Sequence, residues 1–147
     1  MFDDKNEILK KLKTLCFDIE IENAAIGKEI SVTGNYNLKE TSISFFAESR
    51  SDDIEKTLFL GIKVLENLDE LITKAKAYIA EKLLDMYIDE NDHGITKKEF
   101  IHNFSLASVA TINKSVVILD FFDNEIFGHM VSVTSIDGGH SFTDIEM

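Results

Sequence analysis

The C-terminal third of the chain holds the residue types that bind metal ions and move protons. These are Asp120, Asp123, Glu125, His129, Asp137, His140 and Asp144. Histidine and carboxylate side chains serve as metal ligands and as general acids and bases. Their spacings match no ligand motif, and the first three flank a predicted turn. A small hydrolase or metal-dependent enzyme that uses His129 with Asp120, Asp123 or Glu125 stays an alternative, and we predict no metal site.

A second candidate for chemistry is the segment 89–99, whose composition is similar to a calcium-binding EF-hand loop. Asp89 stands at position one and Gly94 at position six of such a loop. The bidentate glutamate belongs at position twelve, where this chain has Phe100, and Glu99 comes one position early. We therefore expect a polar loop from Asp89 to Gly94, without a bound calcium ion.

Nucleophilic catalysis has no evident residue set. The single cysteine, Cys16, lies in an apolar run, and no histidine or arginine adjoins it to lower its pKa. We expect a buried, unreactive thiol. The chain has no Gly-x-Ser-x-Gly motif and no glycine-rich phosphate loop. The sequence thus predicts no catalytic residue and no cofactor.

The charge of the chain is strongly acidic, with 27 Asp and Glu against 15 Lys and Arg and a net charge of −12. Nucleic-acid binders need clustered Lys and Arg, so we expect no nucleic-acid partner. A basic protein partner would be attracted and steered, although acidity can also serve solubility alone. One cysteine, no apolar span and no signal peptide predict a cytoplasmic protein without a membrane partner.

The element pattern begins with a helix over 5–15, because Ile8, Leu9, Leu12 and Leu15 form one apolar stripe. Alternation from Phe17 to Ile21 predicts a half-buried strand. Two further strands, over 30–36 and 42–48, form a hairpin with a loop at 37–41. Apolar residues at helical spacing over 52–88 then predict two helices that meet near Asn67, the first capped by Ser51 and the second by an Asn67–Glu70 capping box.

The remaining elements are a short helix and three strands. Thr96 and Glu99 form a capping-box pair, which predicts a helix over 97–104. The strands are expected over 106–112, 116–122 and 126–135, with turns at 113–114, 123–124 and 138–139. The length predicts one domain, 1–147. The order α-β-β-β-α-α-α-β-β-β predicts an α+β fold, with a largely antiparallel sheet of about six strands against two or three helices.

The last 50 residues carry a family-like pattern. It consists of Thr96-Lys-Lys-Glu-Phe100, then Phe127-Gly128-His129 with Val131 and Val133, then Asp137-Gly138-Gly139. This pattern resembles a bacterial family known as domain of unknown function 2262, which shows an aromatic-Gly-His step on a late strand. Two features depart from that family, since Phe127 replaces a frequent Trp and the ending is not apolar-Gly. The resemblance implies no activity; small domains of this kind resemble the immunity proteins of bacterial toxin systems.

The Gly128-His129 step is the most distinctive part of this pattern. A glycine inside a strand indicates a bulge or the close approach of another group, so we expect Gly128 to be a structural glycine. His129 would then hydrogen-bond into the sheet or face a pocket. We single it out as the histidine with a possible functional role, and both uses stay open.

The charge and the missing catalytic residues favour a non-enzymatic protein-binding module, most concretely an immunity protein that neutralises a basic toxin domain. A structural or regulatory subunit is a further alternative, and the chain would be a monomer or a homodimer. Residues 101–147 hold six acids and one lysine. We therefore expect an acidic face at the C-terminal sheet edge and the segment 85–92. Its candidate residues are Asp85, Asp89, Glu90, Asp92, Asp120, Asp123 and Glu125.

Overall fold

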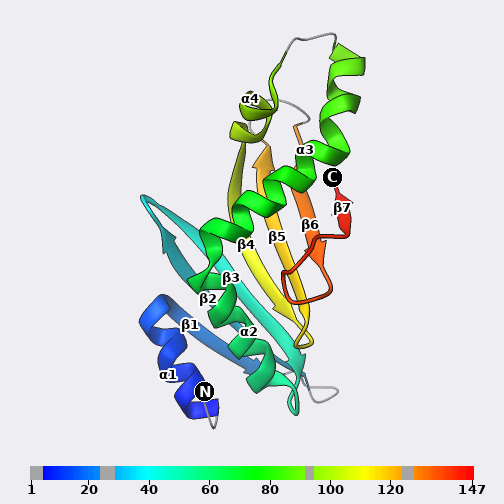
Figure 1. Ribbon diagram of the computed structural model, residues 1–147. Coiled ribbons are helices and arrows are strands. Elements are labelled where there is room, and N and C mark those ends of the chain that lie inside the picture. The colour runs from blue at the N-terminus through cyan, green and yellow to red at the C-terminus, as the bar shows by residue number, and fades with distance from the viewer. Residues whose placement is uncertain (1–4, 24–28, 92–94, 124–127) are drawn as a thin grey trace.

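The computed structural model describes residues 5–23, 29–91, 95–123 and 128–147, which form four helices and one seven-stranded sheet (Figure 1). The helices are α1 (Lys5–Leu15), α2 (Ile54–Glu66), α3 (Leu68–Asn91) and α4 (Lys97–His102). The strands are β1 (Cys16–Asn23), β2 (Glu29–Leu38), β3 (Thr41–Arg50), β4 (Phe104–Ile112), β5 (Val116–Asp123), β6 (Val131–Ser135) and β7 (Asp144–Glu146).

The sheet follows the order of the sequence from β1 to β7. Every neighbouring pair is antiparallel except β3 and β4, which are parallel. Parallel neighbours cannot be joined by a tight turn, so the chain must cross over between them, and α2, α3 and α4 form that crossover. The α+β fold with a largely antiparallel sheet is therefore confirmed, with one strand more than the sequence predicted.

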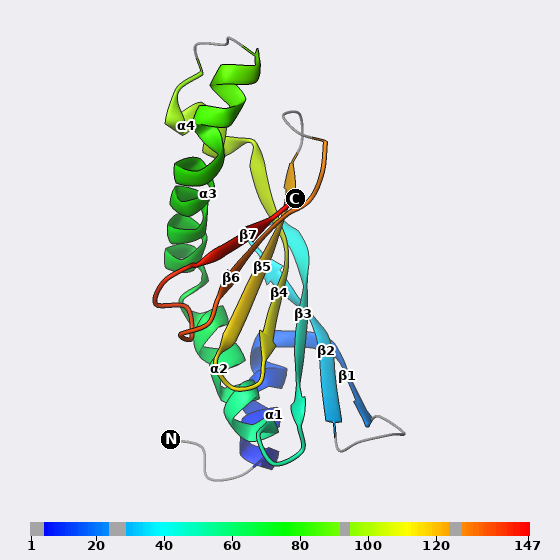
Figure 2. The same ribbon diagram turned by 90° about the vertical axis from the view of Figure 1, so that its right-hand side faces the viewer.

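Helices α1, α2 and α3 lie against the same face of the sheet (Figure 2). The core fills the space between these two layers. Its largest fully buried side chains come from both, and they include Phe45, Phe121 and Leu119 from strands and Leu58 and Ile62 from α2. The fold is thus a two-layer packing of helices on a sheet.

The helical layer approaches the sheet closely at Gly61 of α2. A Cβ atom at this position would lie 2.6 Å from Cζ and 2.9 Å from Cε1 of Phe45 on β3. The ring of Phe45 is itself only 1% exposed, so it has little room to move away. Glycine here lets the helix backbone rest directly on an aromatic ring.

Hydrogen bonds tie the beginning of α2 to the turn between β4 and β5. The buried hydroxyl of Thr111 donates to the Thr57 carbonyl at 3.2 Å, and the Lys114 N–H donates to Thr57 Oγ1 at 2.8 Å. Lys114 also forms an ion pair of 3.7 Å with Asp53. Thr57 is fully buried, and these bonds satisfy its polar groups.

The helix predictions agree with the structure over most of their length. The helix over 5–15 and the break between α2 and α3 at Asn67 are confirmed. Ser51 is not the N-cap of α2. A turn in which Asp53 N–H donates to the Arg50 carbonyl places Asp53 there. Asn67 was predicted to cap α3 in a capping box with Glu70. In the structure it is the C-cap of α2, and its Nδ2 donates to the Lys63 carbonyl at 2.9 Å.

Two boundaries around α4 differ from the prediction. Helix α3 continues to Asn91, so the polar loop expected from Asp89 is helical for its first three residues. The capping box of Thr96 and Glu99 is confirmed, since each side chain accepts a hydrogen bond from the backbone N–H of the other. The helix ends at His102, because Phe104 pairs with Asp123 as the first residue of β4.

Three predictions for the strands need correction, and one strand was missed. The alternation predicted from Phe17 to Ile21 is broken, because a bulge shifts the register of the edge strand β1 between Phe17 and Glu20. Phe17 and Ile21 therefore point to opposite faces, and they are 41% and 42% exposed. The hairpin turn is shorter than 37–41, because Lys39 adopts a φ of 56° and lets β2 and β3 pair from Leu38 and Thr41 onward. Strand β6 begins at Val131, and not at 126. The three-residue strand β7 was not predicted.

The predicted turns have backbone conformations that suit them. Asn113 and Lys114 both have positive φ, as a tight hairpin turn requires. Gly138 and Gly139 also have positive φ, which confirms that turn. The turn predicted at 123–124 falls partly outside the described residues.

None of the described helices combines the length and the apolar content that crossing a bilayer requires.

The contact at Gly61 yields a stability prediction. Gly61→Ala gains up to about 1 kcal/mol of helix propensity but overpacks the core, which costs about 1–3 kcal/mol. We expect a net decrease in the free energy of unfolding, measured by urea denaturation. The cost should shrink when Phe45→Leu shortens the opposing side chain. An equal cost in both backgrounds would show that the ring does not limit the helix position.

Candidate functional site

The face of the sheet that points away from α1, α2 and α3 is the broadest candidate surface. In β5, Val117, Leu119 and Phe121 are buried toward the helices, and the residues between them point the other way. The same alternation holds in β2, β3, β4 and β6. No helix of the described residues lies on this side (Figure 2). We call it the open face.

Almost all of the charged side chains on the open face are acidic. Strand alternation and cross-strand register place seven acidic side chains and one basic side chain on it. The acids are Glu20, Glu22, Glu29, Glu48, Asp120, Asp144 and Glu146, and the base is Arg50. These residues come from five of the seven strands, so the charge extends across the sheet and is not confined to one edge.

Lysine is segregated to the other side of the molecule. None of the seven strands contains a lysine. Eleven lysines lie in the helices instead, at positions 5, 10, 11, 13, 56, 63, 74, 76, 82, 97 and 98. The helical layer therefore balances its own acids, while the open face keeps an excess of negative charge.

Asp120 lies at the centre of the C-terminal half of the open face. Ser108 on β4 donates to its Oδ2 at 2.7 Å, and Ser132 on β6 donates to its Oδ1. Both serines are the register partners of Asp120, so the three side chains form a row across three strands. This row fixes the carboxylate while leaving it only partly buried.

An apolar group borders this carboxylate. Phe122 is 53% exposed and Met130 is 46% exposed. Phe121 pairs with Val131, so the next position along both chains places Met130 beside Phe122. Aromatic residues and Met are enriched in protein interfaces, where they supply contact area. The open face thus combines an acidic surface with an exposed apolar pair.

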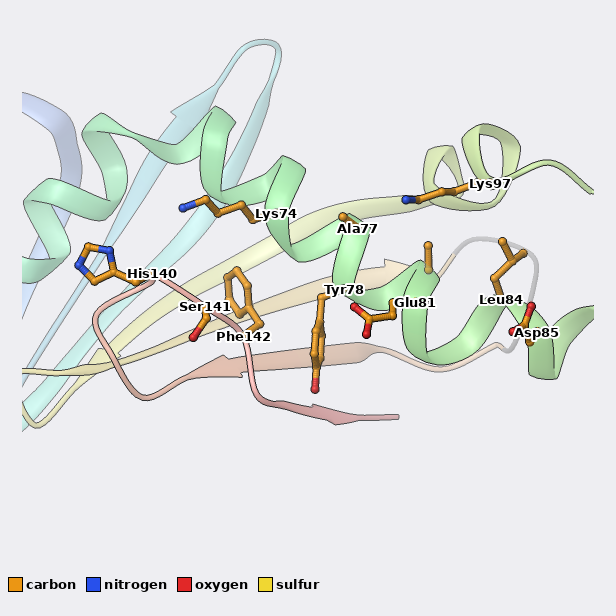
Figure 3. Close-up of a pocket in the computed structure, with 11 residues that line it drawn as sticks. Lys74, Ala77, Tyr78, Glu81, Leu84, Asp85, Lys97, His140, Ser141 and Phe142 are labelled. Atoms are coloured by element: carbon orange, nitrogen blue, oxygen red, sulfur yellow. The ribbon is translucent and has the colours of Figure 1, made fainter.

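A second concave surface lies on the helical side. A shallow groove of about 730 Å³ separates α3 from the segment 140–142 (Figure 3). The rings of Tyr78 and Phe142 meet in it, with centroids 6.4 Å apart. Asp85 lines the groove together with Lys74 and Lys97. Basic and acidic groups are therefore mixed here, in contrast to the open face.

The acids predicted as one face lie in different places. Asp120 is on the open face, whereas Asp85 is exposed on α3 in the helical layer. Asp123 lies three residues after Asp120 in β5, so it points to the opposite side, where Asn103 Nδ2 donates to it at 2.5 Å.

The other predicted acids have side chains outside the residues that the structure describes. Asp89 and Glu90 lie in the last turn of α3, and their side chains are outside the described residues. Asp92 and Glu125 are outside them altogether.

The Gly128-His129 step is not in a strand, which corrects the prediction for both residues. They form a bend before Met130, and both are exposed. Gly128 has a φ of 72°, and a Cβ atom there would meet nothing within 4 Å. The glycine therefore serves a left-handed backbone conformation and neither a bulge nor a close contact. Phe127, the aromatic residue of the step, lies outside the described residues.

The described residues show no arrangement for metal or thiol chemistry. Among residues 5–23, 29–91, 95–123 and 128–147, no three His, Cys, Asp or Glu side chains are placed to hold a metal ion. Cys16 is buried, as expected, and burial raises the pKa of its thiol to about 11. The thiol is therefore protonated at neutral pH, and protonated thiols are poor nucleophiles.

The acids of β1, β2, β3 and β7 were not among the predicted site residues. Glu48, Asp144 and Glu146 join Asp120 on one face only because the sheet places distant segments side by side. One signal was available in the sequence, since every segment predicted as a strand lacks lysine.

Comparison with known proteins adds no relative. A scan against protein-family models and searches of curated proteins and of solved structures found no match to the chain. The resemblance to domain of unknown function 2262 therefore stays a prediction.

Asp137 organises the loop that leads into β7. Its carboxylate accepts hydrogen bonds from the Ser135 hydroxyl at 2.7 Å, and from the Ser141 hydroxyl and backbone N–H at 2.6 and 2.9 Å. The Ser141 hydroxyl, and then the Ser135 hydroxyl, hold the pKa of this carboxyl well below its usual range. Gly139 N–H donates to Ser135 Oγ at 2.9 Å and completes the loop.

This loop gives a pH-dependent prediction. Because the pKa of Asp137 is lower in the folded state, its stabilisation is complete above the unfolded value of about 4 and is lost as the pH falls below it. Asp137→Asn should therefore lower the melting temperature at pH 7, and the difference from the parent should shrink between pH 4 and pH 3. Calorimetry measures both quantities. Asp144→Asn is the control, and a difference that stays constant down to pH 3 would contradict this role.

Proposed function

We propose that this chain is a non-enzymatic protein-binding module whose open face docks a basic protein partner. The supporting observation is the charge on that face, where the described strand residues include seven acids and one base, Arg50. Opposite charge across an interface accelerates encounter and disfavours wrong partners. The segregation of lysine to the helices gives the molecule two unlike sides, so a basic partner is oriented as it approaches.

The apolar pair supports the same proposal. Charge steers association, but buried apolar contacts supply much of the affinity at the centre of an interface. Phe122 and Met130 provide such contacts next to Asp120. A partner that matches this arrangement carries basic side chains around an apolar centre.

The most concrete form of the proposal is an immunity protein that neutralises a basic toxin domain in the cytoplasm. Its support is the small size and acidity of the chain, and the analogy drawn from the C-terminal sequence pattern. The partner would then be encoded next to the gene for this chain, because such proteins are produced together with their toxins.

The test compares two variants with the same change in charge. The first neutralises the open face, with Glu48→Gln, Asp120→Asn, Asp144→Asn and Glu146→Gln. The second neutralises exposed acids of the helical layer, with Glu55→Gln, Asp69→Asn, Glu81→Gln and Asp85→Asn. Binding to the protein encoded by the adjacent upstream gene is measured by calorimetry and by stopped flow at low and at physiological salt.

We expect the open-face variant to lose at least about tenfold in affinity, with a slower association rate and a weaker salt dependence. The helical-layer variant should bind nearly as tightly as the parent chain. Equal losses in the two variants would contradict the assignment of the face. A parent chain that does not bind the neighbouring product would contradict the immunity form.

A further inference from the structure

A basic notch lies on the helical side, opposite the open face. It is a hollow of about 660 Å³ between α3 and α4, lined by Lys76, Lys98, Glu99, Ile101 and His102. Lys76 comes from α3 and the other four residues come from α4. Among the lining residues that the structure describes, Lys76 and Lys98 carry positive charge, on a protein whose net charge is −12.

Glu99 is the one acid among the described residues that line the notch, and its carboxylate accepts hydrogen bonds. Glu99 accepts from the Thr96 hydroxyl at 2.9 Å and from the Thr96 N–H at 3.3 Å, as the second half of the capping box. Its carboxylate is therefore held at the start of α4, where it balances the helix dipole. The carboxylate keeps its charge, and Lys76 and Lys98 together leave the notch with an excess of positive charge.

Lys76 is the central basic group. It is half-buried, and the structure shows no ion pair for it within the described part of the chain. Burial lowers its pKa, and repulsion from Lys39 in the β2–β3 turn lowers it further. The contrast is Lys74, two residues earlier on α3, which forms an ion pair of 3.8 Å with Glu70. An anion bound in the notch would relieve the repulsion between Lys76 and Lys39.

The size and the residue types of the notch narrow the ligand. Its volume is within the range of sites for small organic molecules, and Ile101 and the lysine stems offer apolar contact. Lysine pairs with carboxylates and with phosphates alike, as a point charge. A phosphate monoester carries a charge of about −1.5 to −2 at neutral pH, more than a carboxylate, so Lys76 and Lys98 attract a phosphate group more strongly.

We propose that the notch between α3 and α4 binds a phosphate-bearing small organic molecule, with Lys76 as the main contact to the phosphate and Ile101 against the organic part. This site is independent of the open face. It lies on the other side of the sheet, and its binding does not require a protein partner.

The test uses phenyl phosphate as the probe, with benzoate as a carboxylate of similar shape and inorganic phosphate as the group alone. NMR titration of the full chain at pH 8 should move the resonances of Lys76, Ile101 and His102 together. Phenyl phosphate should bind more tightly than either comparison compound. Lys76→Gln should weaken it by about tenfold or more, because a charged hydrogen-bond donor is lost.

Lys74→Gln is the matched control, since it removes the same charge from the same helix outside the notch. It should leave the affinity for phenyl phosphate within about twofold of the parent value. Three results would each overturn the proposal: benzoate binding as tightly as phenyl phosphate, equal effects of Lys74→Gln and Lys76→Gln, or resonance changes that do not include the notch. The folding of both variants is checked by their thermal transitions.

Discussion

The contact between Gly61 and the ring of Phe45 is the constraint on which the arrangement of the molecule depends. It seats α2 directly on β3, and the bonds of Thr57 to Thr111 and Lys114 hold the start of that helix at the β4–β5 turn. Because β3 and β4 are parallel, the chain must cross over one face of the sheet to join them. Once α2 lies flat on that face, the whole crossover follows on the same side.

The consequence is a sheet with two unlike faces. The covered face is filled by apolar side chains such as Leu119 and Phe121. The open face, which no described helix covers, carries hydroxyl, amide and carboxylate groups, together with apolar side chains that include Phe46, Ile118, Phe122 and Met130. Lysine lies in the helices and turns, so the layers also differ in charge. Both proposals depend on this separation, since a basic protein and a phosphate-bearing ligand approach from opposite sides.

Local patterns in the sequence predicted most of the elements. Three of these signals depend on residues that lie close together in the sequence, so they could be recognised there. They are the apolar stripe of α1, the capping box at Thr96 and the break at Asn67. Strand β7 has only three residues, which is too short for alternation to be recognised. The acidic face could not be predicted as a unit, because its residues are brought together by strand register. Asp120 and Asp123 were predicted on one face, but both lie in β5, where a spacing of three residues points them to opposite sides.

The most direct test of the open face as a docking surface is hydroxyl-radical footprinting of the chain with and without its protein partner. Phe122 and Met130 are readily oxidised and exposed on that face, while Tyr78 is partly exposed on the helical side. We predict that the partner protects Phe122 and Met130 from oxidation and leaves the oxidation of Tyr78 unchanged. Protection of Tyr78 with full oxidation of Phe122 and Met130 would contradict the account.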